Sequence, residues 1–198
     1  MEGKPISVHV HPFRVDQDAP DLIRGLLTVL GEDITRGGLQ ETPARVTRMW
    51  TAMTSGYGVE PADVLKVFED GGESYDEMVL QKNIPFYSHC EHHMVPFFGV
   101  AHIAYVPAGK IVGLSKLSRL LEIYAHRLQV QERMTAQVVD AIMAHLQPRG
   151  AACLISARHL CMEMRGIQKQ GTYTETTALR GVFMSQPETR AEFLSRIR

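Results

Sequence analysis

The sequence is poor in the features that mark exported, membrane-spanning and nucleic-acid-binding proteins. It has three cysteines, an odd number that argues against a disulfide framework. Lys and Arg total 21 against 22 Asp and Glu, so no excess of positive charge favours a nucleic-acid partner. Residues 1–16 lack the apolar run of a secretory signal, and no segment approaches the roughly eighteen apolar residues of a membrane span. We therefore expect a cytoplasmic protein that binds neither nucleic acid nor a membrane.

The composition is that of an ordinary globular protein. Hydrophobic residues make up 44% of the 198 positions and charged residues 22%. A chain of this length buries roughly 70% of its unfolded surface, enough for a core without disulfides. The polar residues 1–18 have no periodicity and read as a flexible N-terminal arm. We expect a helical region at 19–74 and one main domain at 75–198.

The order of predicted elements indicates an α+β fold with an antiparallel sheet. Apolar residues at helical spacing favour helices, and β-branched and aromatic runs favour strands. In chain order, the patterns predict helices at 21–31, 42–56 and 61–69, strands at 84–88 and 95–106, helices at 113–128 and 131–146, and strands at 151–164 and 173–183.

Two short motifs could together hold a metal ion. The spacing of Cys90 and His93 lets a thiolate and an imidazole turn back onto one ion. In the predicted strand 151–164, the period of two puts His159 and Cys161 on one face. Cys90, His93 and Cys161 form a soft donor set suited to Zn²⁺, and three protein ligands leave a position open for water. The alternatives are loop histidines in solvent and a core role for Cys161, the role that we assign to Cys153.

Further polar residues stand near these motifs or at helix starts. His92 and His159 adjoin the proposed ligands and are suited to proton transfer, because imidazole titrates near neutral pH. A Glu after Gln131 could accept hydrogen bonds from a guanine edge. A helix start that carries Ser and Lys can bind phosphate through its free backbone N–H groups. The basic and polar residues are Ser115, Lys116 and Arg119, with Arg165 after the last cysteine, and the acid is Glu132.

Four segments closely resemble GTP cyclohydrolase I and follow that family's order. They read Ser-His-Cys-Glu-His-His-Met-Val-Pro-Phe at 88–97, Gly-Leu-Ser-Lys at 113–116, Arg-Leu-Gln-Val-Gln-Glu-Arg at 127–133, and His-Leu-Cys-Met with Met-Arg-Gly within 159–166. The resemblance extends from about 31 to 183. It implies the tunnelling fold for 75–198: a four-stranded antiparallel sheet with a helix pair between strands two and three, preceded by N-terminal helices. It also implies a homodecamer of two stacked pentamers, with active sites between subunits.

Site roles follow from the resemblance, residue by residue. It makes Cys90, His93 and Cys161 the ligands of one Zn²⁺ per subunit, in agreement with the choice made from spacing. It assigns proton transfer to His92 and His159, with Ser115 near the ribose or phosphate. The residues that it places on the substrate are Gln131 and Glu132 at the guanine, and Lys116, Arg119, Arg165 and Arg45 at the triphosphate.

The resemblance also implies the reaction. GTP would be hydrolysed to 7,8-dihydroneopterin triphosphate and formate, the first step of pterin and folate biosynthesis. Zinc-bound water would attack C8 of the purine, and ring opening, Amadori rearrangement of the ribose and reclosure would follow. Guanine and triphosphate contacts at opposite ends would fix C8 over the metal.

Two other functions fit parts of the sequence. A structural zinc, closed by His92, His89 or His102, would make the protein a binding or regulatory module. A related tunnelling-fold enzyme, such as a dihydroneopterin-type aldolase or a nitrile reductase of the deazaguanine pathway, would act on another purine or pterin. The combination of both metal motifs with Gln-Glu-Arg at 131–133 favours the cyclohydrolase.

Overall fold

The computed structural model describes residues 19–68, 72 and 74–198, and the expected arm at 1–18 lies outside them. Its helices are α1 (Ala19–Val29), α2 (Thr42–Met53), the 3₁₀ turn η1 (Ser55–Gly58), α3 (Pro61–Val64), α4 (Leu114–Ala125), α5 (Gln131–Leu146), α6 (Leu160–Glu163), α7 (Val182–Ser185) and α8 (Pro187–Arg196). Its strands are β1 (Val67–Phe68), β2 (Val79–Cys90), β3 (Pro96–Val106), β4 (Ile111–Val112), β5 (Leu128–Gln129), β6 (Gly150–His159) and β7 (Thr174–Gly181).

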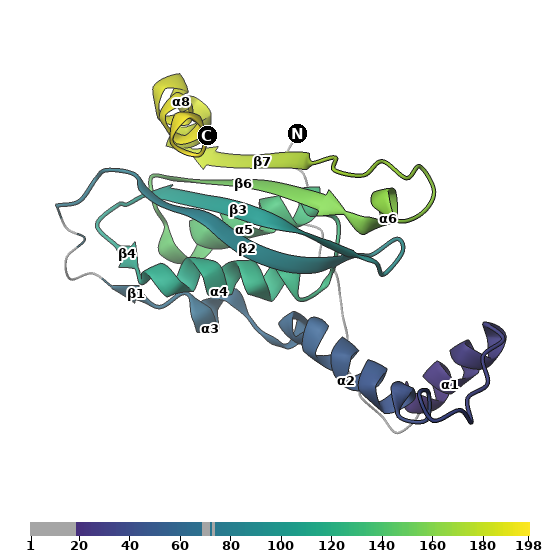
Figure 1. Ribbon diagram of the computed structural model, residues 1–198. Helices are drawn as coiled ribbons and strands as arrows, with labels where there is room; N and C mark the ends of the chain where they lie inside the picture. Colours follow the sequence, from purple (N-terminus) through teal and green to yellow (C-terminus); the bar gives the residue numbers. More distant parts are fainter. Residues whose placement is uncertain (1–18, 69–71, 73) are drawn as a thin grey trace, which may run out of the picture.

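A twisted sheet with the strand order β5-β2-β3-β6-β7 forms the centre of the molecule (Figure 1). The four long strands β2, β3, β6 and β7 pair antiparallel, and α4 and α5 separate β3 from β6 in the chain. The α+β prediction is thus confirmed. The prediction of four strands is wrong by one, because Leu128 and Gln129 pair parallel with His89 and Cys90 at the sheet edge.

The main core lies between one face of the sheet and the helix pair α4 and α5 (Figure 1). Both helices present an apolar stripe to the sheet, as the helical spacing predicts. Leu117, Leu121, Met134 and Ile142 are fully buried there against strand residues such as Phe97. This packing fixes the start of α5 against the ends of β2 and β6.

A second, smaller core lies on the opposite face of the sheet, under the C-terminal helices. Phe183 and Phe193 are both fully buried, and their rings meet edge to face with centroids 5.8 Å apart. They pack against Met78, Ala104 and Ala152. The C-terminal helices therefore close one end of the second face.

Several element boundaries differ from the sequence-based prediction. The strand expected at 151–164 ends at His159, and Leu160–Glu163 forms α6. The strand expected to reach 183 ends at Gly181, where a positive φ of 59° and a close approach to the carbonyl of Arg149 require glycine. The helix expected at 61–69 stops at Val64, because Val67–Phe68 pairs with β4. Helix α8 was not predicted.

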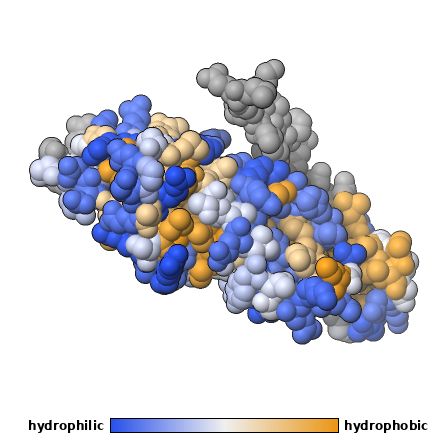
Figure 2. Space-filling model, turned by 90° about the horizontal axis from the view of Figure 1, so that it is seen from above, coloured by the Kyte–Doolittle hydropathy of each residue, from blue (hydrophilic) through white to orange (hydrophobic). Residues whose placement is uncertain are grey.

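The N-terminal helices α1 and α2 pack on each other and project away from the sheet (Figure 1). Helix α1 has no buried residue, and Leu22 and Val29 are 72% and 85% exposed. Figure 2 shows apolar surface at the end of the molecule where α1 lies. Within the part of the chain that the structure describes, no helix combines the length and apolar character needed to cross a bilayer.

Candidate metal and active site

The residues of the two metal motifs meet where strands β2, β3 and β6 end. Cys90 is the last residue of β2, and His93 lies in the turn to β3. This turn is closed by the Met94 N–H, which donates to the carbonyl of Cys90 (2.8 Å). Cys161 lies in α6, just after β6, and β3 pairs with both β2 and β6. The ligand atoms of Cys90, His93 and Cys161 all lie within 4.8 Å of one another.

The prediction that His159 and Cys161 lie on one face of a strand is wrong. His159 is the last strand residue and Cys161 is helical, so the period of two of a strand does not apply to this pair. The turn into α6 is fixed by Glu163, whose carboxylate accepts hydrogen bonds from Arg158 (2.8 and 2.5 Å). This pair lowers the pKa of the buried Glu163 and keeps it ionised at neutral pH. Cys161 is therefore presented by a helix that is anchored to β6.

The donor set suits a soft divalent cation. Cys90 Sγ lies 3.7 Å from His93 Nδ1. Burial and the neighbouring Cys90 thiol raise the pKa of Cys161, because two thiolates side by side repel each other. A bound cation removes that penalty, and thiolate pairs with imidazole favour zinc. Cys153 is fully buried and paired with Ile103, which confirms its core role.

His159 lies beside this group in a defined orientation. Its ring stacks on Phe97 with centroids 4.7 Å apart and an interplanar angle of 3°. Its Nε2 lies 2.7 Å from Oε1 of Gln131, the first residue of α5. Burial lowers the pKa of His159, and the carboxylate of Glu132 opposes this shift. Glu132 itself is exposed in the first turn of α5.

Two more predicted residues lie at the same end of the sheet. His92 is exposed in the β2–β3 turn, and its ring centroid is 6.3 Å from that of His93. The exposed Arg165 follows α6, and its Nη1 donates to His93 Nε2 (3.2 Å). The structure thus gathers both histidines, Glu132 and Arg165 around the three proposed ligands.

The start of α4 does not join this group within one chain. Ser115, Lys116 and Arg119 lie in the first half of α4, whose last turn leads to β5 beside Cys90. Twelve helical residues span about 18 Å, so the helix start lies at the opposite end of the sheet (Figure 1). Arg45 lies on the projecting α2, where it pairs with Glu41. Four of the predicted substrate contacts are therefore remote from Cys90.

The other histidines weighed as a fourth ligand are engaged elsewhere. His89 is buried, and its ring lies 5.0 Å from that of Trp50. His102 is buried on β3, where its Nδ1 accepts from the backbone N–H of Asn83 (3.4 Å). Among the described residues, the group of possible metal ligands contains three members only.

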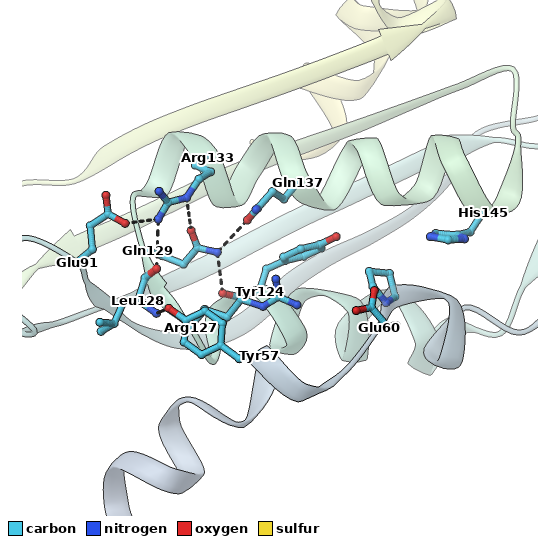
Figure 3. Close-up of a pocket in the computed structure, with 11 residues that line it drawn as sticks. Tyr57, Glu60, Glu91, Tyr124, Arg127, Leu128, Gln129, Arg133, Gln137 and His145 are labelled. Carbon is cyan, nitrogen blue, oxygen red and sulfur yellow. Dashed lines mark hydrogen bonds and ion pairs between the residues drawn. The ribbon is translucent and has the colours of Figure 1, made fainter. Parts of the chain in front are cut away.

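A cavity of about 580 Å³ lies next to Glu91 of the β2–β3 turn, and none of the predicted site residues lines it (Figure 3). Glu91 and Arg133 form an ion pair on its wall. Arg133 Nε also donates to Oε1 of the buried Gln129 (3.1 Å), whose Nε2 donates to Gln137 (2.9 Å). Glu91 follows Cys90 and Arg133 follows Glu132 in the chain. The network therefore connects the β2–β3 turn to the start of α5.

The sequence did not predict this pairing, nor that Thr135 and Thr176 form hydrogen bonds with Gln131. Glu91 and Arg133 lie inside the motifs that were singled out, and their opposite charges were an available signal. The hydroxyls of Thr135 and Thr176 lie 2.6 Å apart. No sequence pattern predicts this contact, because it arises only from the packing of α5 on β7.

Comparison with known proteins identifies the family. A family model described as GTP cyclohydrolase I matches residues 19–198. The chain belongs to the GTP cyclohydrolase I family. GTP cyclohydrolase 1 of Janthinobacterium sp. (strain Marseille) is 52% identical over 187 residues, which cover 94% of each chain. The enzymes of Nitrosospira multiformis and Deinococcus radiodurans are 55% and 53% identical over 86% and 89% of this chain, and 89% and 81% of their own.

A solved structure, archaeosine synthase QueF-Like in the apo form, also matches. The identity is 16% and the TM-score 0.42, over 52% of this chain and 93% of that chain. At that score the likeness adds nothing to the assignment. Membership of the GTP cyclohydrolase I family is shown by the family match and the curated relatives, and it agrees with the resemblance of the four motifs.

Proposed function

We propose that this protein hydrolyses GTP to 7,8-dihydroneopterin triphosphate and formate, the first step of pterin and folate biosynthesis. The family and its curated relatives named GTP cyclohydrolase 1 support this reaction. The observation that carries it is the meeting of two thiols and an imidazole within 4.8 Å, beside His159 and Glu132.

Cys90, His93 and Cys161 would hold one Zn²⁺ per subunit. Two thiolates and one imidazole fit zinc by softness, and their count leaves room for a water. When bound, the zinc ion supplies a Lewis acid that activates water near neutral pH. No fourth protein ligand closes the group among the described residues, which favours a catalytic over a structural metal.

The remaining residues bind and orient the substrate or move protons. Glu132 would accept hydrogen bonds from the guanine edge, and Arg165 would contact the triphosphate. His159 would exchange a proton with the purine ring, and His92, which is exposed in the turn, would serve the later steps. Ser115, Lys116, Arg119 and Arg45 would complete the ribose and triphosphate contacts.

The remote position of α4 supports an active site between subunits. Lys116 and Cys90 lie at opposite ends of one sheet, so both can contact one GTP only if a second copy supplies one of them. The exposed apolar residues of α1 are a further surface for contact between copies. We propose the tunnelling fold and a homodecamer of two stacked pentamers, with the domain boundaries 19–74 and 75–198.

The test compares two cysteine variants in zinc content and turnover. Cys161→Ser should lose both zinc and formate release, because a thiolate ligand is removed. Cys153→Ala is the matched control, since Cys153 is fully buried on β6, six residues before His159 at the end of that strand. It should keep zinc at one per subunit and retain turnover. A Cys161→Ser protein that turns over GTP fully without metal would overturn the proposal.

A further inference from the structure

The carboxamide of Gln131 is fully engaged by protein atoms. The residue is 2% exposed. The two protons of its Nε2 are shared among three acceptors: the carbonyls of Ile155 (3.1 Å) and Thr174 (2.9 Å) and Oγ1 of Thr176 (3.1 Å). Its Oε1 lies 2.7 Å from His159 Nε2. Both amide protons are used within the protein, so this buried side chain has no donor left for guanine.

These contacts fix which way the amide points. Backbone carbonyls can only accept hydrogen bonds, so the NH₂ group must face Ile155 and Thr174. The amide oxygen must then face His159, and it can only accept a hydrogen bond from the imidazole N–H. His159 therefore carries its proton on Nε2 when it is neutral, and its Nδ1 is the nitrogen with the free lone pair.

Two hydroxyls set the same order from the other side. Thr135 Oγ1 donates to the backbone carbonyl of Gln131 (2.7 Å). Because that bond uses its single proton, the hydroxyl of Thr135 must accept from Thr176 Oγ1 at 2.6 Å. Thr176 then has a free lone pair for the amide of Gln131. Donation therefore runs in one direction, from His159 through Gln131 and Thr176 to Thr135.

We propose that Gln131 and Thr176 are positioning residues that hold His159 as the Nε2–H tautomer, with Nδ1 as the atom that exchanges a proton with the substrate. This inference rests on the proposed function of His159 in proton transfer. The stacking of His159 on Phe97 fixes the plane of the ring, and the Gln131 contact fixes its rotation in that plane. Recognition of guanine at the start of α5 is left to Glu132.

Kinetics of the zinc-loaded enzyme separate positioning from binding. Thr176→Val keeps the shape and removes the hydroxyl, and kcat should fall about fivefold through the loss of one hydrogen bond. Gln131→Leu should lower kcat about 10²-fold, the scale of a misplaced proton-transfer group. KM for GTP should stay within about twofold in both. Thr176→Ser restores the hydroxyl and should restore kcat.

A matched control lies one residue along the same strand. Thr177 is exposed, so Thr177→Val should leave kcat and KM unchanged. An unchanged kcat in Thr176→Val and Gln131→Leu would overturn the proposal. A raised KM at constant kcat would overturn it too, since it would show Gln131 to be a guanine contact. Failure of Thr176→Ser to restore kcat would overturn the role of the hydroxyl.

A second readout does not depend on turnover. In ¹⁵N-histidine-labelled, zinc-loaded protein at pH 8, the His159 resonance should show a proton on Nε2, identified by its loss in His159→Asn. Gln131→Leu should change this signal, and Thr176→Ser should keep it. A wild-type proton on Nδ1 would overturn the inference. Absence of formate release by the wild-type protein would instead overturn the proposed function, and the tautomer would still be measured.

Discussion

The residues around the proposed metal ligands differ in how well the sequence alone predicts their positions. Cys90 and His93 stand three apart, so their proximity follows from a tight turn and was predictable. Cys161 was proposed correctly as a neighbour of this pair, but for a wrong geometric reason. Thr176 could not be proposed, because its contact with Gln131 depends on how β7 packs against α5.

His102 shows how a buried histidine without a site role still affects stability. Its Nδ1 accepts a hydrogen bond from Asn83, at the bulge between Gln81 and Ile84 in β2. Burial lowers the pKa of His102, Lys82 adds to this shift and Glu175 opposes it. The folded protein therefore favours the neutral form of the His102 imidazole.

We predict that His102 makes the protein less stable in acid. Below about pH 6.5 the unfolded chain takes up a proton that the folded chain resists, so the free energy of unfolding falls as pH falls. His102→Gln should show a smaller fall in the urea midpoint between pH 7.5 and 5.5 than the wild type. Equal falls in both proteins would show that His102 does not contribute.

At the scale of elements, length decided what was predictable. Helices α4 and α5 have long apolar stripes, and their existence followed from periodicity. Helix α6 has four residues, and the apolar run Leu160–Met162 continues the strand pattern before it. Its turn is held by contacts that strand periodicity does not reveal, such as the Arg158–Glu163 pair and the hydrogen bond from the Lys169 N–H to the carbonyl of Met162.

The short strand β5 was unpredictable for a similar reason. Leu128 and Gln129 form only two pairs with β2, and the hydrogen bond from the Leu128 N–H to the Tyr57 hydroxyl (3.0 Å) helps to hold them. Such contacts join segments 71 residues apart. No local pattern encodes them.

Helix α8 is attached to the sheet mainly through Phe193. The side chain is fully buried against Phe183, and its truncation removes this contact and leaves a cavity. Phe193→Ala should lower the free energy of unfolding by about 3–5 kcal/mol. The adjacent Leu194 is 36% exposed, and Leu194→Ala should cost less than about 1.5 kcal/mol. Equal losses in urea denaturation would contradict this account of α8.

At the scale of the whole molecule, the residues proposed for one site lie at opposite ends of the sheet. Cys90, His93 and Cys161 lie at one end, and Lys116 lies at the start of α4. The sequence motifs predict both groups of residues, but they do not predict the separation, because motif order carries no distance. The proposed assembly, in which α4 of one copy meets the Cys90 group of another, would remove this separation.

Complementation between two inactive variants tests this arrangement. Lys116→Ala and Cys161→Ser should each be inactive as pure oligomers. After co-expression in equal amounts, about a quarter of the sites should combine an intact metal half with an intact Lys116, if assembly is random. Formate release near a quarter of the wild-type rate is expected. A mixed oligomer without activity would show that each site takes both halves from one chain.

The most direct test of the proposed function is incubation of metal-analysed protein with GTP. Formate release and the fluorescence of the oxidised pterin are followed together, with and without a zinc chelator. We predict that both products form, that both are lost on chelation, and that both return when zinc is restored. Absence of formate from an intact, zinc-loaded oligomer, or formate release that persists after zinc is removed, would contradict the account.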